Sequence, residues 1–372
     1  TSAASRVSSD DGTRVYSRSF FGRVQYKYQD KYIAYATLRN EAANKYNQEK
    51  SITLPSVGLA WIVSSEGFMN SANNPIDYLK LRAGWGRLAN GNVPTARAQS
   101  ANSVWAVFND TKVDGFNFSS YQDNLSWEFN EELNLGADVE LLNRRLNITV
   151  DYFVKNTKKL AIPVLPQVGN ETSYNNVGAM RNKGIEISAT WRGKIGEDWG
   201  YTIGGNFSTI HNEVTDLFGQ AFITRGPLAE FPQRLTVGQP FDVFYGYEIT
   251  GVYQTQAEVD GDPAAVAANT AGAGTVKPGY FKFRDVNGDK VLDAKDRIYL
   301  GSPAPTYYYG GSIGLDYKNI DLSIRIYGQG GNIIFNSSRA EVFRNQGRNI
   351  DAQLAENRWH GEGTSNSYPS SE

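Results

Sequence analysis

One acidic segment, residues 285–296, has the residue types and the spacing of a loop that binds a hard cation. Oxygen-bearing side chains recur at loop positions 1, 3, 5, 9 and 12, and position 7 offers a backbone carbonyl, as in EF-hand calcium loops. This spacing brings several oxygen ligands toward one centre, so it predicts a structural Ca²⁺ site and no organic cofactor. The predicted ligands are Asp285, Asn287, Asp289, Val291 through its carbonyl, Asp293 and Asp296.

The same segment departs from the EF-hand pattern at two positions. Lys290 stands at position 6, where the sharp turn favours glycine, and Asp296 replaces the longer bidentate glutamate of position 12. The alternative is a solvated acidic turn whose charge is offset by four cations, Arg284, Lys290, Lys295 and Arg297. A bound cation would have a structural role, because it would stiffen the long loop predicted over 213–305.

Residues that could perform catalysis are sparse. The only histidines are His211, near a predicted strand end, and His360, in the terminal loop, and single histidines at such places are typical of polar surfaces. No Gly-x-Ser-x-Gly, His-Glu-x-x-His or phosphate-binding Gly-Lys-Ser/Thr run occurs. Adjacent carboxylates such as Glu131 and Glu132 fall on opposite faces of a strand. We therefore expect no enzyme activity.

Aromatic residues gather in two predicted loops and are candidates for substrate binding. Aromatic faces stack on sugar rings, and neighbouring Asn or Asp side chains bond the hydroxyls. The alternative is that these rings pack the loops against each other. The candidates are Trp105, Tyr121, Phe241, Tyr245 and Tyr247.

Composition limits the class of protein that positions these residues. The 372 residues carry a net charge of −2, so no basic surplus supports nucleic-acid binding. Cysteine is absent, which excludes disulfides and thiolate metal sites and suits an exported bacterial protein. No apolar run is long enough for a transmembrane helix. With 22 Tyr and 37 Gly, the composition differs from that of an ordinary globular domain.

The dominant periodicity is two, so we predict an all-β fold. Leu146, Ile148 and Val150, for example, alternate with Asn147 and Thr149. Most of the predicted strands have ten or more residues, which is the length that a tilted strand needs to cross a bilayer. About ten strands are predicted, near 17–28, 31–40, 53–63, 78–87, 128–141, 144–156, 183–193, 199–212, 306–317 and 320–329.

The connections alternate between tight turns and long loops, which is the asymmetry of outer-membrane β-barrels. Polar residues on the second face of each strand, such as Asp138 and Asp151, would be costly in a dry core but not in a hydrated lumen. Tyr and Trp near the short-turn ends predict an interfacial girdle. These are Tyr26, Tyr28, Tyr32, Tyr78, Trp191, Trp199, Tyr201 and Tyr317.

Several stretches, in this order and spacing, resemble the SusC/RagA family of TonB-dependent outer-membrane transporters. The run Asn-x-Gly-x-x-Arg-Asn-Lys-Gly-Ile-Glu from Asn176 is the most specific of them. The others are Phe20–Tyr26, Leu54–Trp61, Leu79–Gly86, Asn124–Glu128, Phe283–Asp289 and Arg358–Thr364. Together they extend over nearly the whole chain.

The resemblance implies that residues 1–372 are part of a 22-stranded barrel domain whose plug and final strands lie outside this chain. Residues 213–305 are then an extracellular loop region with a candidate calcium loop at 285–296. The family imports oligosaccharides or oligopeptides across the bacterial outer membrane. It works with a SusD-like surface lipoprotein as a lid and with energy from the TonB complex, which acts through segments absent here.

Three readings of function remain at this point. The first is an oligosaccharide importer, with an oligopeptide importer of the same family beside it. The second is a non-transporting outer-membrane barrel, such as a porin or an adhesin. The third is a soluble secreted β-protein that binds glycans and carries one calcium loop.

Overall fold

In the computed structural model the chain forms two compact units, each of which is described by itself. The first comprises residues 1–220 and 306–329, and the second comprises residues 221–305 and 330–372. The structure describes residues 16–44, 46, 49–71, 74–91, 101–108, 111–118, 126–164, 173–225, 233–270, 275–338 and 352–370.

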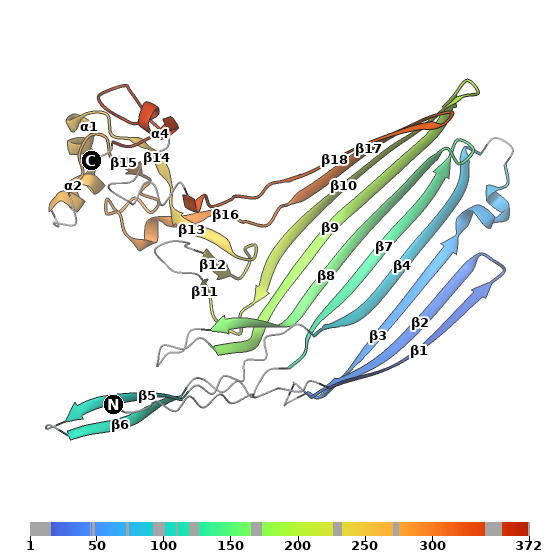
Figure 1. The fold of residues 1–372 in the computed structure, drawn as a ribbon, viewed down its shortest axis with the longest axis horizontal. Coiled ribbons are helices and arrows are strands. Elements are labelled where there is room, and N and C mark those ends of the chain that lie inside the picture. Colours follow the sequence, from blue (N-terminus) through green and yellow to red (C-terminus); the bar gives the residue numbers. More distant parts are fainter. Residues whose placement is uncertain are drawn as a thin grey trace, which may run out of the picture. The chain divides into compact units, whose positions relative to one another are not determined.

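The first unit is built on a ten-stranded sheet in the order β1-β2-β3-β4-β7-β8-β9-β10-β17-β18. Figure 1 shows these strands side by side in chain order. From β1 to β17 every neighbouring pair is antiparallel. The bounds are β1 Ser17–Tyr28, β2 Tyr32–Ala43, β3 Ser51–Ile62, β4 Ile76–Asn90, β7 Glu128–Leu141, β8 Leu146–Val164, β9 Ser173–Ile195, β10 Trp199–Asp216, β17 Tyr307–Tyr317 and β18 Ile320–Gly330.

Each predicted strand corresponds to one strand of this sheet, so the all-β antiparallel prediction is confirmed. Within the described residues the sheet is open, with β1 and β18 at its edges. No helix of the described chain is both long and apolar enough to cross a membrane.

The tight turns have a local cause. Gln29 and Asp30 adopt φ values of +49° and +54° between β1 and β2, which is the pattern of a type I′ hairpin turn. The turn between β7 and β8 has three consecutive positive-φ residues, Leu142, Asn143 and Arg144. These left-handed conformations match the twist of the flanking strands, so the predicted short connections are real hairpins.

Two strands are longer than the alternation predicts. β8 and β9 have 19 and 23 residues, because their pairing continues beyond an irregularity between Thr157 and Leu160. Lys159 adopts a φ of +54° at this point, as expected for a bulge. The bulge interrupts the period of two, so the outer parts of both strands carry no alternation signal.

Parts of the predicted loops form regular structure. β5 (Ala101–Phe108) and β6 (Thr111–Phe118) make an antiparallel hairpin between β4 and β7. The second unit contains the sheet β11-β12-β13-β16 and the pair β14-β15. The bounds are β11 Phe222–Arg225, β12 Gln233–Thr236, β13 Val243–Tyr247, β14 Ile249–Val252, β15 Phe281–Phe283, β16 Arg297–Gly301, α1 Gln256–Gly261, α2 Pro263–Thr270 and α4 Ala352–Asn357.

The two units bury different amounts of apolar side chain. In the second unit Leu235, Val243 and Val259 are at most 1% exposed, as in an ordinary core. In the first unit one cluster, of Ala43, Tyr46 and Trp127, is buried near the strand ends opposite the tight turns. Burial raises the pKa of the Tyr46 hydroxyl to about 12, with smaller contributions from Glu128 and Glu41.

Candidate functional site

The strand register of the large sheet places apolar side chains in continuous rows on one face. Neighbouring strands pair residue by residue, so the members of each row lie directly across from one another. One row runs from Tyr32 on β2 to Tyr309 on β17. Its members, in order, are Tyr32, Trp61, Leu81, Ala137, Val150, Ile187, Phe207 and Tyr309.

This apolar face has a defined height. Along β8 it extends from Leu146 to Val154, about 27 Å of strand, or about 19 to 22 Å at a tilt of 35–45°. Beyond Val154, the next residues on the same face of β8 are polar or charged, and the Arg87–Glu131 ion pair lies level with them. Lys158 adds a second contact to Glu131 at 2.7 Å. The height matches the outward apolar band of transmembrane barrels.

The opposite face carries charged and hydroxyl side chains. Arg82 donates to Asp138 at 2.9 and 3.1 Å and to Asp151 at 3.1 Å, so one guanidinium bridges two carboxylates. Gly136 lies between them, and a Cβ there would overlap Asp151 and lie 2.7 Å from the Arg82 Cζ. The glycine is therefore needed for this network. Such a network costs little folding free energy where the face meets water.

The same polar face is hollowed over β9, β10, β17 and β18. The hollow has a volume of about 970 Å³. Ser188, Asn206 and Ser312 line it, and Gly204 and Gly310 keep its floor low, since a Cβ at either position would crowd a neighbouring side chain. Arg325 also lines the hollow, and the hydroxyl and amide groups beside it suit a polar ligand or a polypeptide segment.

The second unit carries a platform of stacked rings and guanidinium groups, which we call the aromatic platform. Tyr245 on β13 pairs with Tyr299 on β16, and their ring centroids are 5.4 Å apart. The guanidinium of Arg234 lies 3.7 Å from the Tyr245 ring centroid and 3.8 Å from that of Phe222. These contacts are close enough for cation–π attraction, which fixes the orientation of the rings.

The platform continues along the same two strands. Tyr247 pairs with Arg297, whose guanidinium lies 5.1 Å from the ring centroid. Tyr299 is 38% exposed and Arg297 is also exposed, so part of the platform is open to a ligand. Flat rings beside guanidinium donors can stack on a sugar ring and bond its hydroxyls.

The structure brings together some of the predicted substrate-binding residues. Tyr245 and Tyr247 both belong to the aromatic platform. Phe241 precedes β13, and its carbonyl accepts a hydrogen bond from Ser302 Oγ at 3.4 Å. Trp105 lies in β5, but its side chain is outside the described part of the structure, and so is the whole of Tyr121.

Arg234, Arg297 and Tyr299 were missed by sequence reasoning. The signal that was available is the alternation of large residues in 243–247 and again in 297–301. Each run has five residues, and nothing local indicates that the two runs pair across the intervening chain. Long-range pairing of short strands cannot be read from a period.

The acidic segment forms a compact loop held by its own carboxylates. Asp285 accepts hydrogen bonds from the backbone N–H groups of Gly288 at 2.7 Å and Lys290 at 2.8 Å. Lys290 adopts a φ of +67°, so it takes the left-handed conformation that a glycine would provide at position 6. The departure from the EF-hand pattern at this position is therefore accommodated by the backbone.

Position 12 of the same loop is fully buried. Asp296 accepts hydrogen bonds from the N–H groups of Val286 at 3.0 Å and Asp293 at 2.8 Å. The bond from Asp293 contributes most to lowering the pKa of Asp296. Within the described residues no group of three or more His, Cys, Asp or Glu side chains is arranged to hold a metal ion. The calcium site stays a prediction.

The comparisons with known proteins agree with the two-faced sheet. Residues 1–294 match the family model described as TonB dependent receptor-like, beta-barrel. The chain belongs to this family. Its members are TonB-dependent transporters of the outer membrane and not enzymes.

Curated members of the TonB-dependent receptor family resemble the chain over most of its length. TonB-dependent receptor P3 of Formosa agariphila is 32% identical over 334 residues, which cover 87% of this chain and 33% of that protein. TonB-dependent receptor SusC of Bacteroides thetaiotaomicron is 27% identical over 341 residues, covering 87% of this chain and 32% of SusC. The chain thus spans about a third of the length of these relatives.

Two solved structures share the fold. The structure of the RagAB peptide transporter matches with a TM-score of 0.72 at 22% sequence identity, covering 95% of this chain and 38% of that one. The RagAB peptide importer in its open-open state matches with a TM-score of 0.73 at 21% identity, covering 95% and 37%. The predicted resemblance to SusC/RagA-type receptors is confirmed.

Proposed function

We propose that the chain is a barrel segment of an outer-membrane nutrient importer that takes up oligosaccharides. A SusD-like surface lipoprotein serves as its lid, and the TonB complex supplies energy through segments outside this chain. The observation that carries the proposal is the strand register. It puts an apolar band on one face of the sheet and the Arg82 network and a polar hollow on the other. This is the division between lipid and a wide hydrated lumen.

The resemblance to the SusC/RagA family implies oligosaccharides or oligopeptides as substrates, and the aromatic platform supports oligosaccharides on chemical grounds. Its tyrosines offer ring faces and its arginines offer hydrogen-bond donors, which is the combination that sugars need. The alternative is an oligopeptide importer. It is favoured by the match to the RagAB peptide transporter and by the capacity of Arg234 and Arg297 to bond peptide carbonyls and carboxylates.

The decisive experiment is calorimetric titration of the full-length protein, purified in detergent, with matched panels of neutral oligosaccharides and oligopeptides. We expect an oligosaccharide to bind, and Tyr299→Ala to weaken it about tenfold because a stacking face is lost. Tyr16→Ala is the control, since Tyr16 is an exposed tyrosine of the first unit. If only peptides bind, the oligopeptide importer replaces the oligosaccharide importer as the proposed function.

A second test separates an importer from a porin or an adhesin. Cells that lack the TonB energy supply should bind the substrate at their surface but should not accumulate it. Accumulation without TonB would indicate a passive pore, and binding without any accumulation in wild-type cells would indicate an adhesin. A chain that remains monomeric in buffer without detergent would contradict every barrel reading, because the apolar band would then face water.

We also propose that the 285–296 loop holds a structural Ca²⁺. The oxygen donors at its alternate positions and the left-handed Lys290 support this assignment. Calcium should raise the thermal unfolding temperature of the second unit, and EDTA should reverse the effect. Asp285→Ala should abolish the calcium dependence, whereas Asp260→Ala on the exposed surface of α1 should not. An unfolding temperature independent of calcium would contradict the site.

A further inference from the structure

The polar hollow over β9, β10, β17 and β18 is lined by side chains whose hydrogen-bonding groups are unused. Ser188, Asn206, Ser312 and Gln329 all line it, and none of these side chains makes a hydrogen bond to another residue in the described part of the chain. Each of them can both donate and accept. Polar groups of this kind are satisfied either by water or by a ligand.

The polar face is different over β4, β7 and β8. Arg82 donates there to Asp138 and Asp151, and Thr149 Oγ1 donates to Asp138 at 3.3 Å. The polar side chains of this region are therefore engaged with one another. The unused groups of the polar hollow are a local feature, and not a general property of the face.

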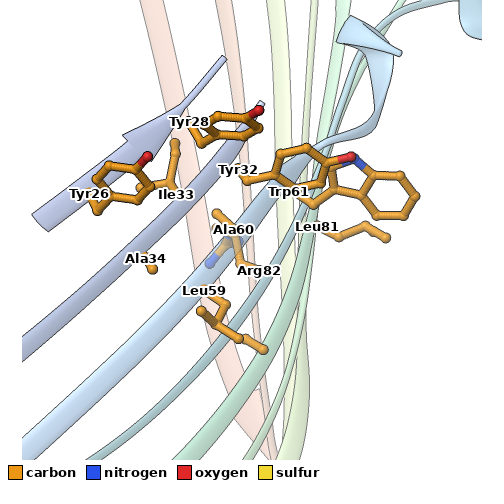
Figure 2. A pocket seen from close by; sticks show the side chains of 11 residues that line it. Tyr26, Tyr28, Tyr32, Ile33, Ala34, Leu59, Ala60, Trp61, Leu81 and Arg82 are labelled. Atoms are coloured by element: carbon orange, nitrogen blue, oxygen red, sulfur yellow. The ribbon is translucent and has the colours of Figure 1, made fainter. Parts of the chain in front are cut away.

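The apolar hollow of about 460 Å³ on β1–β4 also differs from the polar one. Figure 2 shows Tyr32 and Trp61 among the residues that line it. Both donate to Glu66, at 2.7 and 3.1 Å, and Lys31 donates to the same carboxylate at 3.0 Å. The bond from Tyr32 and then those from Lys31 and Trp61 lower the pKa of Glu66 to about 2, so the carboxylate stays ionised and keeps these donors engaged.

β18 adds a cation and an exposed ring to the polar hollow. A Cβ added at Gly328 would meet the ring of Tyr309, which belongs to the apolar row. Arg325 and Tyr327 alternate with Gly328, so they are on the polar face, where both line the hollow. Arg325 forms no ion pair with a carboxylate of the described residues. Tyr327 is 92% exposed, so its ring is open to a ligand.

We propose that the polar hollow binds a short oligosaccharide, as a sugar site separate from the aromatic platform. The inference rests on the proposed function, since it requires the polar face to line the lumen of an importer. Sugar hydroxyls both donate and accept, as the amide and hydroxyl side chains of the hollow do. The Tyr327 ring offers a stacking face, and Arg325 offers forked donors to neighbouring sugar oxygens. The volume of about 970 Å³ is within the range of small-ligand sites.

A polypeptide segment is the competing occupant. The backbone groups of β9, β10 and β17 already pair within the sheet, so a peptide lying on this face would find side chains alone as partners. No carboxylate is among the described residues that line the hollow, so cationic side chains of a peptide would have no counterion there. A sugar, which carries hydroxyls on every ring, makes better use of the lining.

Photoaffinity labelling of the full-length protein, purified in detergent, locates the site. The probes are neutral oligosaccharides with a diazirine group at the reducing end, and mass spectrometry identifies the labelled peptides. We expect label on β17 and β18 as well as on the aromatic platform, and excess unlabelled oligosaccharide should remove both labels. Label confined to the second unit would overturn the sugar site in the hollow, including the case in which another segment of the full-length chain covers it.

Two substitutions test the groups that carry the proposal. Arg325→Ala and Tyr327→Ala should each lower labelling of the hollow about tenfold, because charged donors or a stacking face are lost. Arg192→Ala is the matched control, since Arg192 is on the polar face of β9 and does not line the hollow. Labelling of the aromatic platform should stay at the wild-type level in all three, which shows that they are folded. Equal labelling of the hollow in all three would overturn the proposal.

Peptide probes that carry the same diazirine separate this inference from the proposed function. If peptides label the hollow and oligosaccharides do not, a polypeptide is the occupant and the sugar site is wrong. If oligosaccharides label the platform alone, only this inference fails. If they label neither region, both fail. A labelled hollow in a protein whose cells accumulate no oligosaccharide would leave the site in place and overturn only the import function.

Discussion

The large sheet and the second unit use their apolar residues in opposite ways. On the sheet, Val24 is 72% exposed, Leu59 is 65% exposed and Ile326 is 64% exposed, yet all three belong to regular alternating strands. In the second unit, Leu235, Val243 and Val252 are at most 2% exposed, within strands of only four or five residues.

The difference identifies the solvent of each region. Exposed aliphatic rows are costly in water but not in lipid, where the surrounding chains replace a packed core. The second unit needs its own core because it meets water on its surface. A mutation that creates a cavity should therefore hurt the second unit most, and a mutation that adds charge should hurt the sheet most.

The largest expected effect is a cavity in the second unit. Leu235→Ala should lower the free energy of unfolding of this unit by about 4 kcal/mol, because both transfer and cavity terms apply at a fully buried site. Leu135→Ala on the apolar face of β7 is the control. Lipid chains can fill the space there, so it should lose only the transfer term. Denaturant titration monitored by hydrogen exchange reports the two regions separately, and equal losses would contradict the comparison.

The second-largest loss of stability is expected from a charge in the apolar band. Val150 is at the middle of the band on β8, so Val150→Arg should cost about 3 kcal/mol in the unfolding free energy measured in phospholipid vesicles. Thr149→Arg, on the polar face of the same strand, should be nearly neutral. If both substitutions cost the same, the assignment of lipid and lumen faces is wrong.

A smaller loss is expected from Gly184→Ala in β9. The glycine pairs with Phe153 on β8 and Ile210 on β10, and an added Cβ would overlap the carbonyl oxygen of Thr209. Because a backbone atom cannot move aside easily, the strain should cost about 2 kcal/mol. Gly22→Ala in β1, where no atom lies near the added Cβ, is the matched control. Urea unfolding midpoints in vesicles would compare them.

The smallest effect concerns the tight-turn side of the sheet. The folded pKa of Glu66, about 2, is below that of an unfolded glutamate, about 4.3. Its contribution to stability is therefore complete above about pH 4.3 and declines as the pH falls toward 2. Glu66→Gln should remove this part of the pH dependence, measured by thermal unfolding in detergent between pH 2 and 5. An unchanged pH profile would show that the three hydrogen bonds do not favour the ionised form.

The sequence was sufficient to predict the sheet but not the second unit. Long alternating strands are specified locally, so the bounds of β1 and β7 agree with prediction to the residue. β8 and β9 are longer than predicted because the bulge near Lys159 changes the period of the alternation. β11, β12, β13 and β16 are too short to show a period.

The candidate site, too, could be predicted only where a local pattern specifies it. Tyr245 and Tyr247 could be recognised as aromatics of a predicted loop, but Arg234, which lies over the Tyr245 ring, comes from another strand through pairing that no local pattern specifies. The Arg82 network depends on register in the same way, since Asp138 and Asp151 are on two different strands.

The pairing of β10 with β17 has a consequence for how such proteins can diversify. These strands match over eleven consecutive residues, from Trp199↔Tyr317 to Thr209↔Tyr307, although about ninety residues of chain separate them. The entropy of closing a loop grows only logarithmically with its length, and each doubling costs about 0.6 kcal/mol. The sequence between these strands can therefore be shortened, lengthened or exchanged at little thermodynamic cost. One sheet can thus carry many different recognition modules while its own strand pairs remain unchanged.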